Sequence, residues 1–170
     1  MRLLFFSLFF YCILLQGQPS KAIVLTEYEQ AVFDSDTCCW RKLADEGRYN
    51  EGGQLILSYL DISQKITNPH ALKWHAGQMF ALAGNNRQAI KWFEKTYSIF
   101  YKWFGGQDGK AWYYYAKGTV AFLKRDKATL QKIIGHWDKQ LPKDINYTSL
   151  TTLLEKWDKT YREATDSKRL

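Results

Sequence analysis

Apolar residues recur along most of this chain at intervals of three and four positions, the spacing of an amphipathic α-helix. Residues 71–97 show the pattern best, because two short patterned segments flank a tight polar turn at Gly84, Asn85 and Asn86. Alternation of β-branched residues, which would indicate strands, is nearly absent. The pattern therefore predicts an all-α protein. The predicted helices cover residues 25–32, 35–45, 49–65, 70–83, 87–104, 110–123, 128–140 and 148–164.

Most of these predicted helices form consecutive pairs. A helix, a tight polar turn and a second helix recur three times, over residues 35–65, 70–104 and 110–140. A single pair cannot bury both sides of its apolar stripe, whereas stacked pairs can, and a solitary last helix can cover the final face. We therefore expect an α-solenoid of about three antiparallel helix pairs with a C-terminal capping helix. The glycine-rich stretch 105–109 is expected to be a flexible connection between two pairs.

The middle pair carries small and aromatic residues at regular positions. Gly77 is followed three residues later by Phe80, Gly84 lies in the turn, and Ala89 is followed four residues later by Phe93. This pattern resembles a tetratricopeptide repeat (TPR), and the resemblance implies a TPR-like superhelix. The physical reason is close packing, because a glycine and an alanine let the two helices approach while the phenylalanine rings fill the space beside them.

The other two pairs match the repeat more loosely. Gly118 takes the close-contact position in the third pair, while Gly47 and Gly52 fit the turn and the second-helix contact of the first pair. The spacing also departs from the family, since Gly77 and Gly118 are 41 residues apart, against about 34 for the repeat. Trp74 stands one residue later than the pattern expects.

In TPR proteins the first helix of each pair lines a concave face, and the resemblance places a partner-binding surface there. Positions 112, 115, 119 and 122 are spaced three and four apart, so they share one helix face. Aromatic rings with an arginine suit an extended peptide or a partner helix. The alternative is that this stripe is core and that the last helix fills the face with Trp157 and Tyr161. The predicted partner-binding residues are Arg41, Trp74, Gln78, Trp112, Tyr115, Thr119 and Phe122.

The N-terminal residues predict export. Arg2 precedes an almost wholly apolar run over residues 3–15, which ends before Pro19 and a few small residues. This is the layout of a secretory signal peptide, here residues 1–22, and it predicts a periplasmic or extracellular protein. The run is shorter than the roughly 20 apolar residues of a spanning helix, and an uncleaved anchor is the alternative. A repeat domain over 23–164 and a polar tail over 165–170 would follow.

Charge and cysteine content narrow the possible partners. Loss of the signal peptide would lower the net charge from +7 to +5, a modest positive balance that suits an anionic envelope surface. The alternative is that this charge serves only solubility. No basic run is dense enough to predict nucleic-acid binding. The adjacent Cys38 and Cys39 are expected to be reduced and to act as small buried hydrophobes. A vicinal disulfide, which would not fit inside a helix, and a redox or metal pair are the alternatives.

Motifs for catalysis are missing from the sequence. The chain contains no HExxH, GxSxG or phosphate-cradling loop, and His70 and His75 are five residues apart, which places them on different helix faces. We therefore expect no enzymatic activity, no cofactor and no metal.

The predicted function is that of an exported scaffold that binds a protein or peptide partner in an envelope assembly. The alternative is a protein that binds glycan or another envelope polymer, because Trp74, Trp92, Trp103 and Trp112 could stack on sugar rings.

Overall fold

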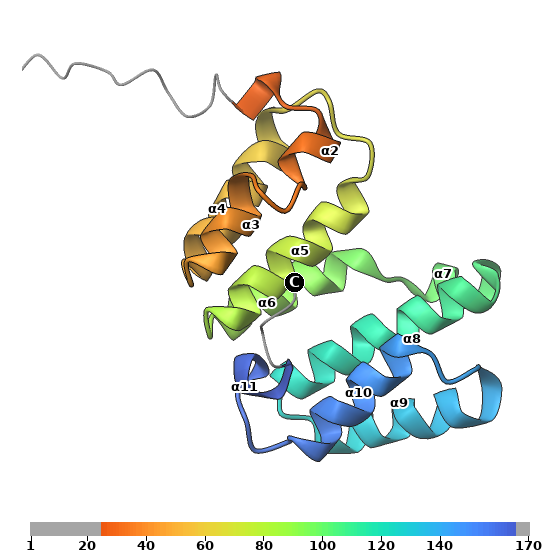
Figure 1. Ribbon diagram of the computed structural model, residues 1–170. Coiled ribbons are helices and arrows are strands. Elements are labelled where there is room, and N and C mark those ends of the chain that lie inside the picture. Colours follow the sequence, from red (N-terminus) through yellow and green to blue (C-terminus); the bar gives the residue numbers. More distant parts are fainter. Residues whose placement is uncertain (1–24, 166–170) are drawn as a thin grey trace, which may run out of the picture.

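The computed structural model describes residues 25–165, and these residues fold into helices without any strand (Figure 1). None of the described helices is long and apolar enough to cross a membrane. The predicted signal peptide and residues 166–170 of the predicted tail lie outside the described residues. The helices are α2 (Gln30–Phe33), α3 (Cys39–Asp45), α4 (Tyr49–Ile62), α5 (Pro69–Leu82), α6 (Asn86–Phe93), the 3-10 helix η1 (Glu94–Thr96), α7 (Ile99–Phe104), α8 (Gly106–Leu123), α9 (Lys127–Gln140), α10 (Ile145–Glu155) and α11 (Tyr161–Thr165).

Consecutive helices pack side by side across the molecule. The pairs α3–α4, α5–α6 and α8–α9 are each joined by a tight turn, and α4 also packs on α5. Helix α10 lies against both α8 and α9, and the short α11 returns to contact α5 (Figure 1). The prediction of an all-α protein is therefore confirmed.

Three turns of the described chain share one backbone geometry. Each contains a residue with positive φ: 73° at Gly47, 76° at Gly84 and 58° at Arg125. The N–H of the next residue then donates to the carbonyl five positions back, which closes the end of the preceding helix. These bonds join Arg48 to Leu43 (2.8 Å), Asn85 to Phe80 (2.8 Å) and Asp126 to Ala121 (2.9 Å).

The third of these turns has an arginine where the other two have glycine, the residue that adopts positive φ at least cost. The Arg125 guanidinium donates to the backbone carbonyls of Trp157 and Lys159, and it lies over the Phe122 and Trp157 rings. Arg125 therefore fastens this turn to the segment between α10 and α11, which a glycine could not do.

Large side chains from neighbouring helices rest directly on glycines. A Cβ atom at Gly53 would lie 2.9 Å from the Phe80 ring, and one at Gly77 would lie 2.6 Å from the Phe93 ring. Both rings are fully buried, and burial of each contributes roughly 1.5–3 kcal/mol. The close-contact role predicted for Gly77 is confirmed, because no larger residue would leave room for Phe93.

The same arrangement recurs elsewhere in the core. A Cβ atom at Gly52 would meet Met79, and one at Gly118 would lie 2.7 Å from Leu150. Glycine contacts therefore bring α4 onto α5, α5 onto α6 and α8 onto α10. Gly52 and Gly118 are close-contact positions as predicted, but their nearest neighbours lie on α5 and α10 and not on the other helix of their own pair.

The predicted helix over residues 87–104 is broken. Helix α6 ends at Phe93, and the chain becomes extended at Tyr97 and Ser98 before α7 begins. Thr96 explains the break in part, because its buried hydroxyl donates to the Phe93 carbonyl and competes with the helical hydrogen bonds. Ser98 then starts a new helix, since its hydroxyl accepts the N–H of Tyr101.

Two further boundaries differ from the sequence prediction. The stretch 105–109, predicted to be a flexible connection, is mostly helical, because α8 begins at Gly106. Gly105 and Gly109 let α8 approach α7, since a Cβ atom on either would lie 2.6 Å from the Tyr101 carbonyl. The last predicted helix is divided into α10 and α11, where Thr160 and Glu163 bond to each other and begin α11.

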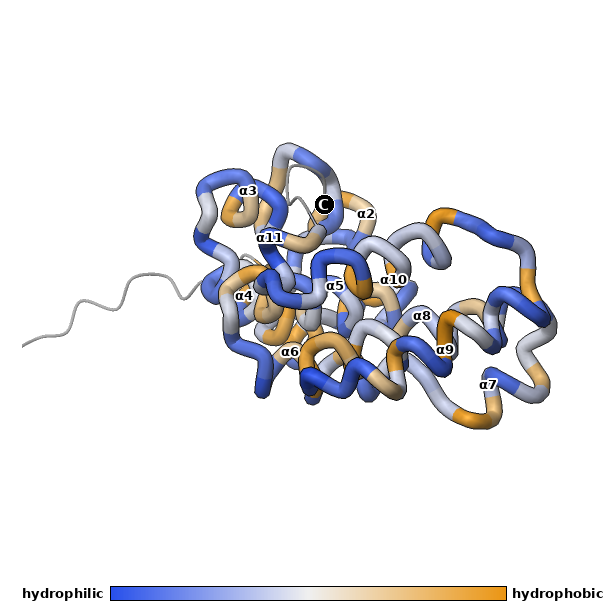
Figure 2. Tube along the Cα trace, turned by 90° about the horizontal axis from the view of Figure 1, so that it is seen from below, coloured by the Kyte–Doolittle hydropathy of each residue, from blue (hydrophilic) through white to orange (hydrophobic). Residues whose placement is uncertain are grey.

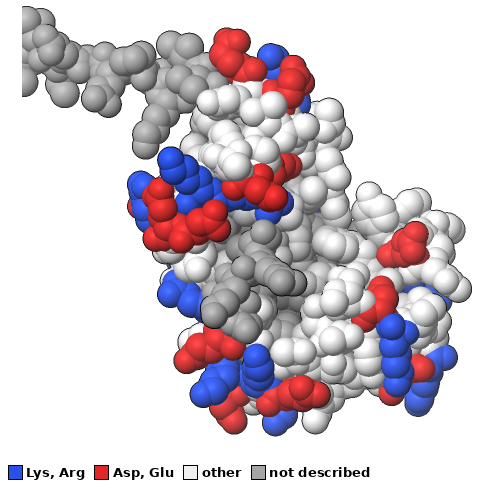
Figure 3. Space-filling model, viewed as in Figure 1, with Lys and Arg blue, Asp and Glu red and all other residues white. Residues whose placement is uncertain are grey.

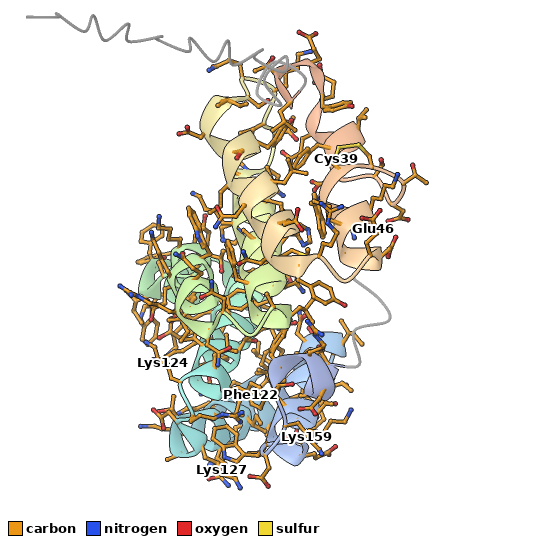
Figure 4. The ribbon with its side chains drawn as sticks, turned by 90° about the vertical axis from the view of Figure 1, so that its left-hand side faces the viewer. Cys39, Glu46, Phe122, Lys124, Lys127 and Lys159 are labelled. Carbon is orange, nitrogen blue, oxygen red and sulfur yellow. A yellow bond between two sulfur atoms is a disulfide. The ribbon has the colours of Figure 1, made fainter. Side chains whose placement is uncertain are left out.

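Cys38 and Cys39 form a vicinal disulfide, so the expectation of reduced cysteines is wrong. The bonded pair does not sit inside a helix. Cys38 is extended and precedes α3, while Cys39 opens the helix with a φ of 56°. Helix α3 therefore begins at Cys39 instead of the predicted residue 35 (Figure 4).

We predict opposite effects of alanine at two glycines inside helices. Gly77→Ala should destabilise the protein by about 1–3 kcal/mol, because its methyl group would collide with the buried Phe93 ring. Gly135→Ala, where a Cβ atom meets nothing within 4 Å, should stabilise α9 by about 0.5–1 kcal/mol. Urea unfolding of both variants measures the difference, and equal stability would contradict the packing at Gly77.

Candidate functional site

The structure brings together part of the predicted concave face. The Trp74 ring, from α5, lies 4.8 Å from the Trp112 ring and 5.0 Å from the Tyr115 ring, both from α8. The third ring beside Trp74 is that of Phe93, at 4.4 Å. The resulting group of rings joins the second helix pair to the third.

The remaining predicted partner-binding residues lie at different places in the structure. Thr119 and Phe122 continue along α8 and are buried, while Gln78 is half-buried on α5. Arg41 is not part of the ring group, because it is held within the first pair. Its guanidinium lies 4.3 Å from the Trp40 ring centre and donates to the Asp34 carbonyl.

The C-terminal helices cover this face. Tyr161, from α11, is buried 6.4 Å from the Phe93 ring and bonds to Gln78, while Ser149, from α10, bonds to the Tyr115 hydroxyl. Burial raises the pKa of both the Tyr161 and the Tyr115 phenol, so both stay protonated.

The far end of the face is closed in the same way. Trp157 stands edge-on to Phe122 at 5.6 Å, and Phe122 lies near the turn that carries Lys159 (Figure 4). Arg162 fastens α11 by donating to the Leu82 carbonyl at 2.9 Å. The expectation of an open aromatic groove is therefore corrected for Trp74, Thr119 and Phe122, and the alternative, a face filled by the C-terminal segment, is what the structure shows.

His75 links the first helix pair to this covered face. Its ring stacks on Trp40 at 4.9 Å, and its Nδ1 atom lies 2.9 Å from the Gln78 side-chain oxygen. Gln78 in turn bonds to Tyr161, so the chain of contacts runs from α3 through α5 to α11. Burial lowers the pKa of His75, an effect that the Gln78 hydrogen bond and the Asp34 charge only partly oppose.

A different surface carries the exposed apolar residues, and the sequence interpretation missed it. All large apolar residues of α7 are between 50% and 75% exposed. Figure 2 shows α7 at an outer corner of the molecule. The sequence could have indicated this exposed cluster, because five of the six α7 residues are apolar and the helix therefore has no polar face. We call this cluster the α7 patch; it comprises Ile99, Phe100, Tyr101, Trp103 and Phe104.

Most of the α7 patch lies on one side of its helix. At roughly 100° per residue, Ile99, Phe100, Trp103 and Phe104 fall within an arc of about 140°. The Phe100 and Phe104 rings lie 4.7 Å apart. The patch is therefore a continuous apolar surface instead of a set of scattered side chains.

A hollow of about 360 Å³ lies beside the α7 patch. Its walls are His70, Tyr101 and Trp112, with Gly105 and Gly109 between them. The His70 and Trp112 rings are fixed by a shared partner, because both form hydrogen bonds to the Thr96 carbonyl.

One lysine of α7 and several lysines nearby in the sequence accompany the α7 patch. The Lys102 ammonium lies 5.2 Å from the Trp103 ring centre and 5.4 Å from those of Tyr113 and Tyr114. Residues 95–117 include four lysines and a single acid, Asp108. In the view of Figure 3 much of the surface at the α7 end is uncharged, and both acidic and basic side chains lie beside it.

Comparison of the chain with protein-family models, with curated proteins and with solved structures finds no match. The candidate site is therefore defined by geometry alone. Within residues 25–165 no group of three or more His, Cys, Asp or Glu side chains is placed to hold a metal ion.

We predict that His75 makes stability depend on pH. Its folded-state pKa lies below the ordinary value of 6.5, so the unfolded chain binds the proton more readily, and stability should fall as the pH drops below about 6.5. The loss cannot exceed about 1.4 kcal/mol per pH unit for one proton. Urea unfolding between neutral and mildly acidic pH should show a smaller loss in His75→Gln than in the wild type, and parallel curves would rule out this role.

Proposed function

We propose that the protein is an exported helical-repeat scaffold that acts by docking instead of catalysis, and that the α7 patch is its docking surface. The observation that carries this proposal is the exposure of five large apolar side chains on one six-residue helix. With roughly 150–250 Å² per aromatic side chain, the four α7 rings leave about 400–650 Å² open. The largest patch on a typical monomer is about 300–600 Å² and is often functional.

Features of the core support the repeat part of this proposal. Three helix pairs end their first helices in turns of the same geometry, and glycine contacts recur between neighbouring helices. We propose a TPR-like solenoid of about three pairs, with α10 as its capping helix. In this arrangement α7 is an insertion between the second and third pairs, and insertions in repeat proteins map to loops that often form the binding face.

The position of the binding surface differs from the one the TPR resemblance implies. A protein or peptide partner on the concave face would have to displace α11 and the buried Tyr161. The α7 patch requires no such displacement. We therefore propose that docking within an envelope assembly takes place through α7.

The glycan alternative receives less support from the structure. Trp74 is buried, Trp112 donates its N–H to the Thr96 carbonyl, and Trp92 lies beneath the Lys95 ammonium at 4.1 Å. Trp103 is therefore the one of the four candidate tryptophans that is largely exposed, and a single ring makes a poor sugar platform.

Replacement of three patch residues tests the proposal. The variant Phe100→Ser/Trp103→Ser/Phe104→Ser should bind an isolated envelope fraction at least tenfold more weakly than the wild type, since each ring contributes about 1.5–3 kcal/mol when fully buried. Sedimentation of the protein with that fraction over a range of concentrations measures the binding. Thermal unfolding should be unchanged, because the three side chains are exposed.

The matched control removes exposed apolar groups elsewhere. Val32 is 46% and Ile145 is 76% exposed, and neither belongs to α7, so Val32→Ser/Ile145→Ser should bind like the wild type. The proposal fails if the patch variant binds as well as the control, or if the wild type does not bind the fraction at all.

A further inference from the structure

We infer that the α7 patch binds the surface of an anionic lipid bilayer. This inference rests on the proposed function, since it names the partner of the same docking surface. Three properties of the patch support it, namely its shape, its residue types and the charge around it.

The shape of the patch suits a deformable partner. Helix α7 is six residues long and lies at an outer corner of the molecule (Figure 2). A stable interface with a protein or a second copy buries about 800 Å² on each side with matched shapes, and the aromatic rings of α7 offer only about 400–650 Å². Lipids rearrange around a small projecting element and need no matched surface.

The residue types are those found where proteins meet the membrane surface. Tryptophan and tyrosine are enriched at the level of the lipid head groups, because each combines an apolar ring with a polar group. Trp103 and Tyr101 supply such rings, while Phe100, Phe104 and Ile99 can enter the acyl region. Lys102 projects from the same helix, and its aliphatic stem can lie along apolar surface while its ammonium stays in the head-group layer.

The charge beside the patch favours anionic lipids. Lys95 of η1, Lys102 of α7, and Lys110 and Lys117 of α8 follow one another along the chain, with Asp108 as the one acid among them. The nearest preceding acid, Glu94, is neutralised by Lys124 at 2.6 Å. Apolar burial combined with adjacent basic groups is the combination that binds proteins reversibly to anionic membranes.

Vesicle binding by the full chain tests this inference. Wild-type protein should bind vesicles of phosphatidylcholine with phosphatidylglycerol at least tenfold more tightly than vesicles of phosphatidylcholine alone, because several lysines contribute. Added salt should reduce that preference. Lys102→Gln and Lys110→Gln should each lower binding to the anionic vesicles by about fivefold.

Patch variants separate insertion of α7 from binding by charge alone or by another segment. Phe100→Ser/Trp103→Ser/Phe104→Ser should lose binding to the anionic vesicles, whereas Val32→Ser/Ile145→Ser should keep it. Trp103→Phe keeps an apolar ring, so it should still bind, but the blue shift of tryptophan emission that accompanies wild-type binding should be largely lost. A blue shift that persists in Trp103→Phe would show that another tryptophan enters the lipid and would overturn the inference.

The remaining outcomes distinguish the two proposals. If the wild type ignores protein-free vesicles but binds the envelope fraction through the α7 patch, and protease treatment of that fraction abolishes binding, the partner is a protein; the lipid inference fails and the proposed function stands. Patch-dependent dimerisation without vesicle binding would replace the lipid by a second copy of the chain. Vesicle binding that is unchanged in the patch variant would overturn the lipid inference. If that variant keeps both its vesicle binding and its envelope binding, both proposals are overturned.

Discussion

The helices of this protein can stack because large side chains are seated on glycines of the neighbouring helix. Phe93 rests on Gly77, Phe80 on Gly53 and Leu150 on Gly118, and in each case a Cβ atom would overlap the seated side chain. Such contacts bring helix axes close enough for continuous apolar packing from α4 to α10. Glycine is unfavourable inside a helix by roughly 0.5–1 kcal/mol, and the burial of a whole ring or leucine side chain more than offsets that cost.

This dependence on local spacing explains what could be predicted from the sequence. The apolar periodicity predicted the helix pairs, and Gly77, Gly118, Gly47 and Gly84 identified contacts and turns that the structure contains. The turns at Gly47 and Gly84 are specified by residues a few positions apart. The break at Thr96 and Ser98 was missed because it depends on single side-chain hydrogen bonds that leave the apolar pattern unchanged. The helical start of α8 was missed because its glycines serve close approach to α7 instead of flexibility.

The candidate site was harder to predict because it depends on contacts between distant segments. Arg162 and Leu82 are 80 residues apart, yet their hydrogen bond brings α11 over the ring group of α5 and α8. The apolar spacing within α8 does not indicate whether a later segment of the chain covers this helix. The same aromatic stripe could therefore belong to an open groove or to the core. The α7 patch was predictable in principle, since a short segment with five apolar residues of six has no room for a polar face.

The extended joint at Tyr97 and Ser98 and the glycines at the start of α8 separate α7 from the regular helix pairs. A continuous helix would have made the orientation of residues 99–104 follow that of α6, and a substitution there would have disturbed the packing of the array. As built, no residue of α7 is buried. The sequence of this short helix can therefore diverge with little effect on folding, which makes α7 the part of the protein where evolution, or an engineer grafting another short helix, could change the partner while the scaffold stays the same.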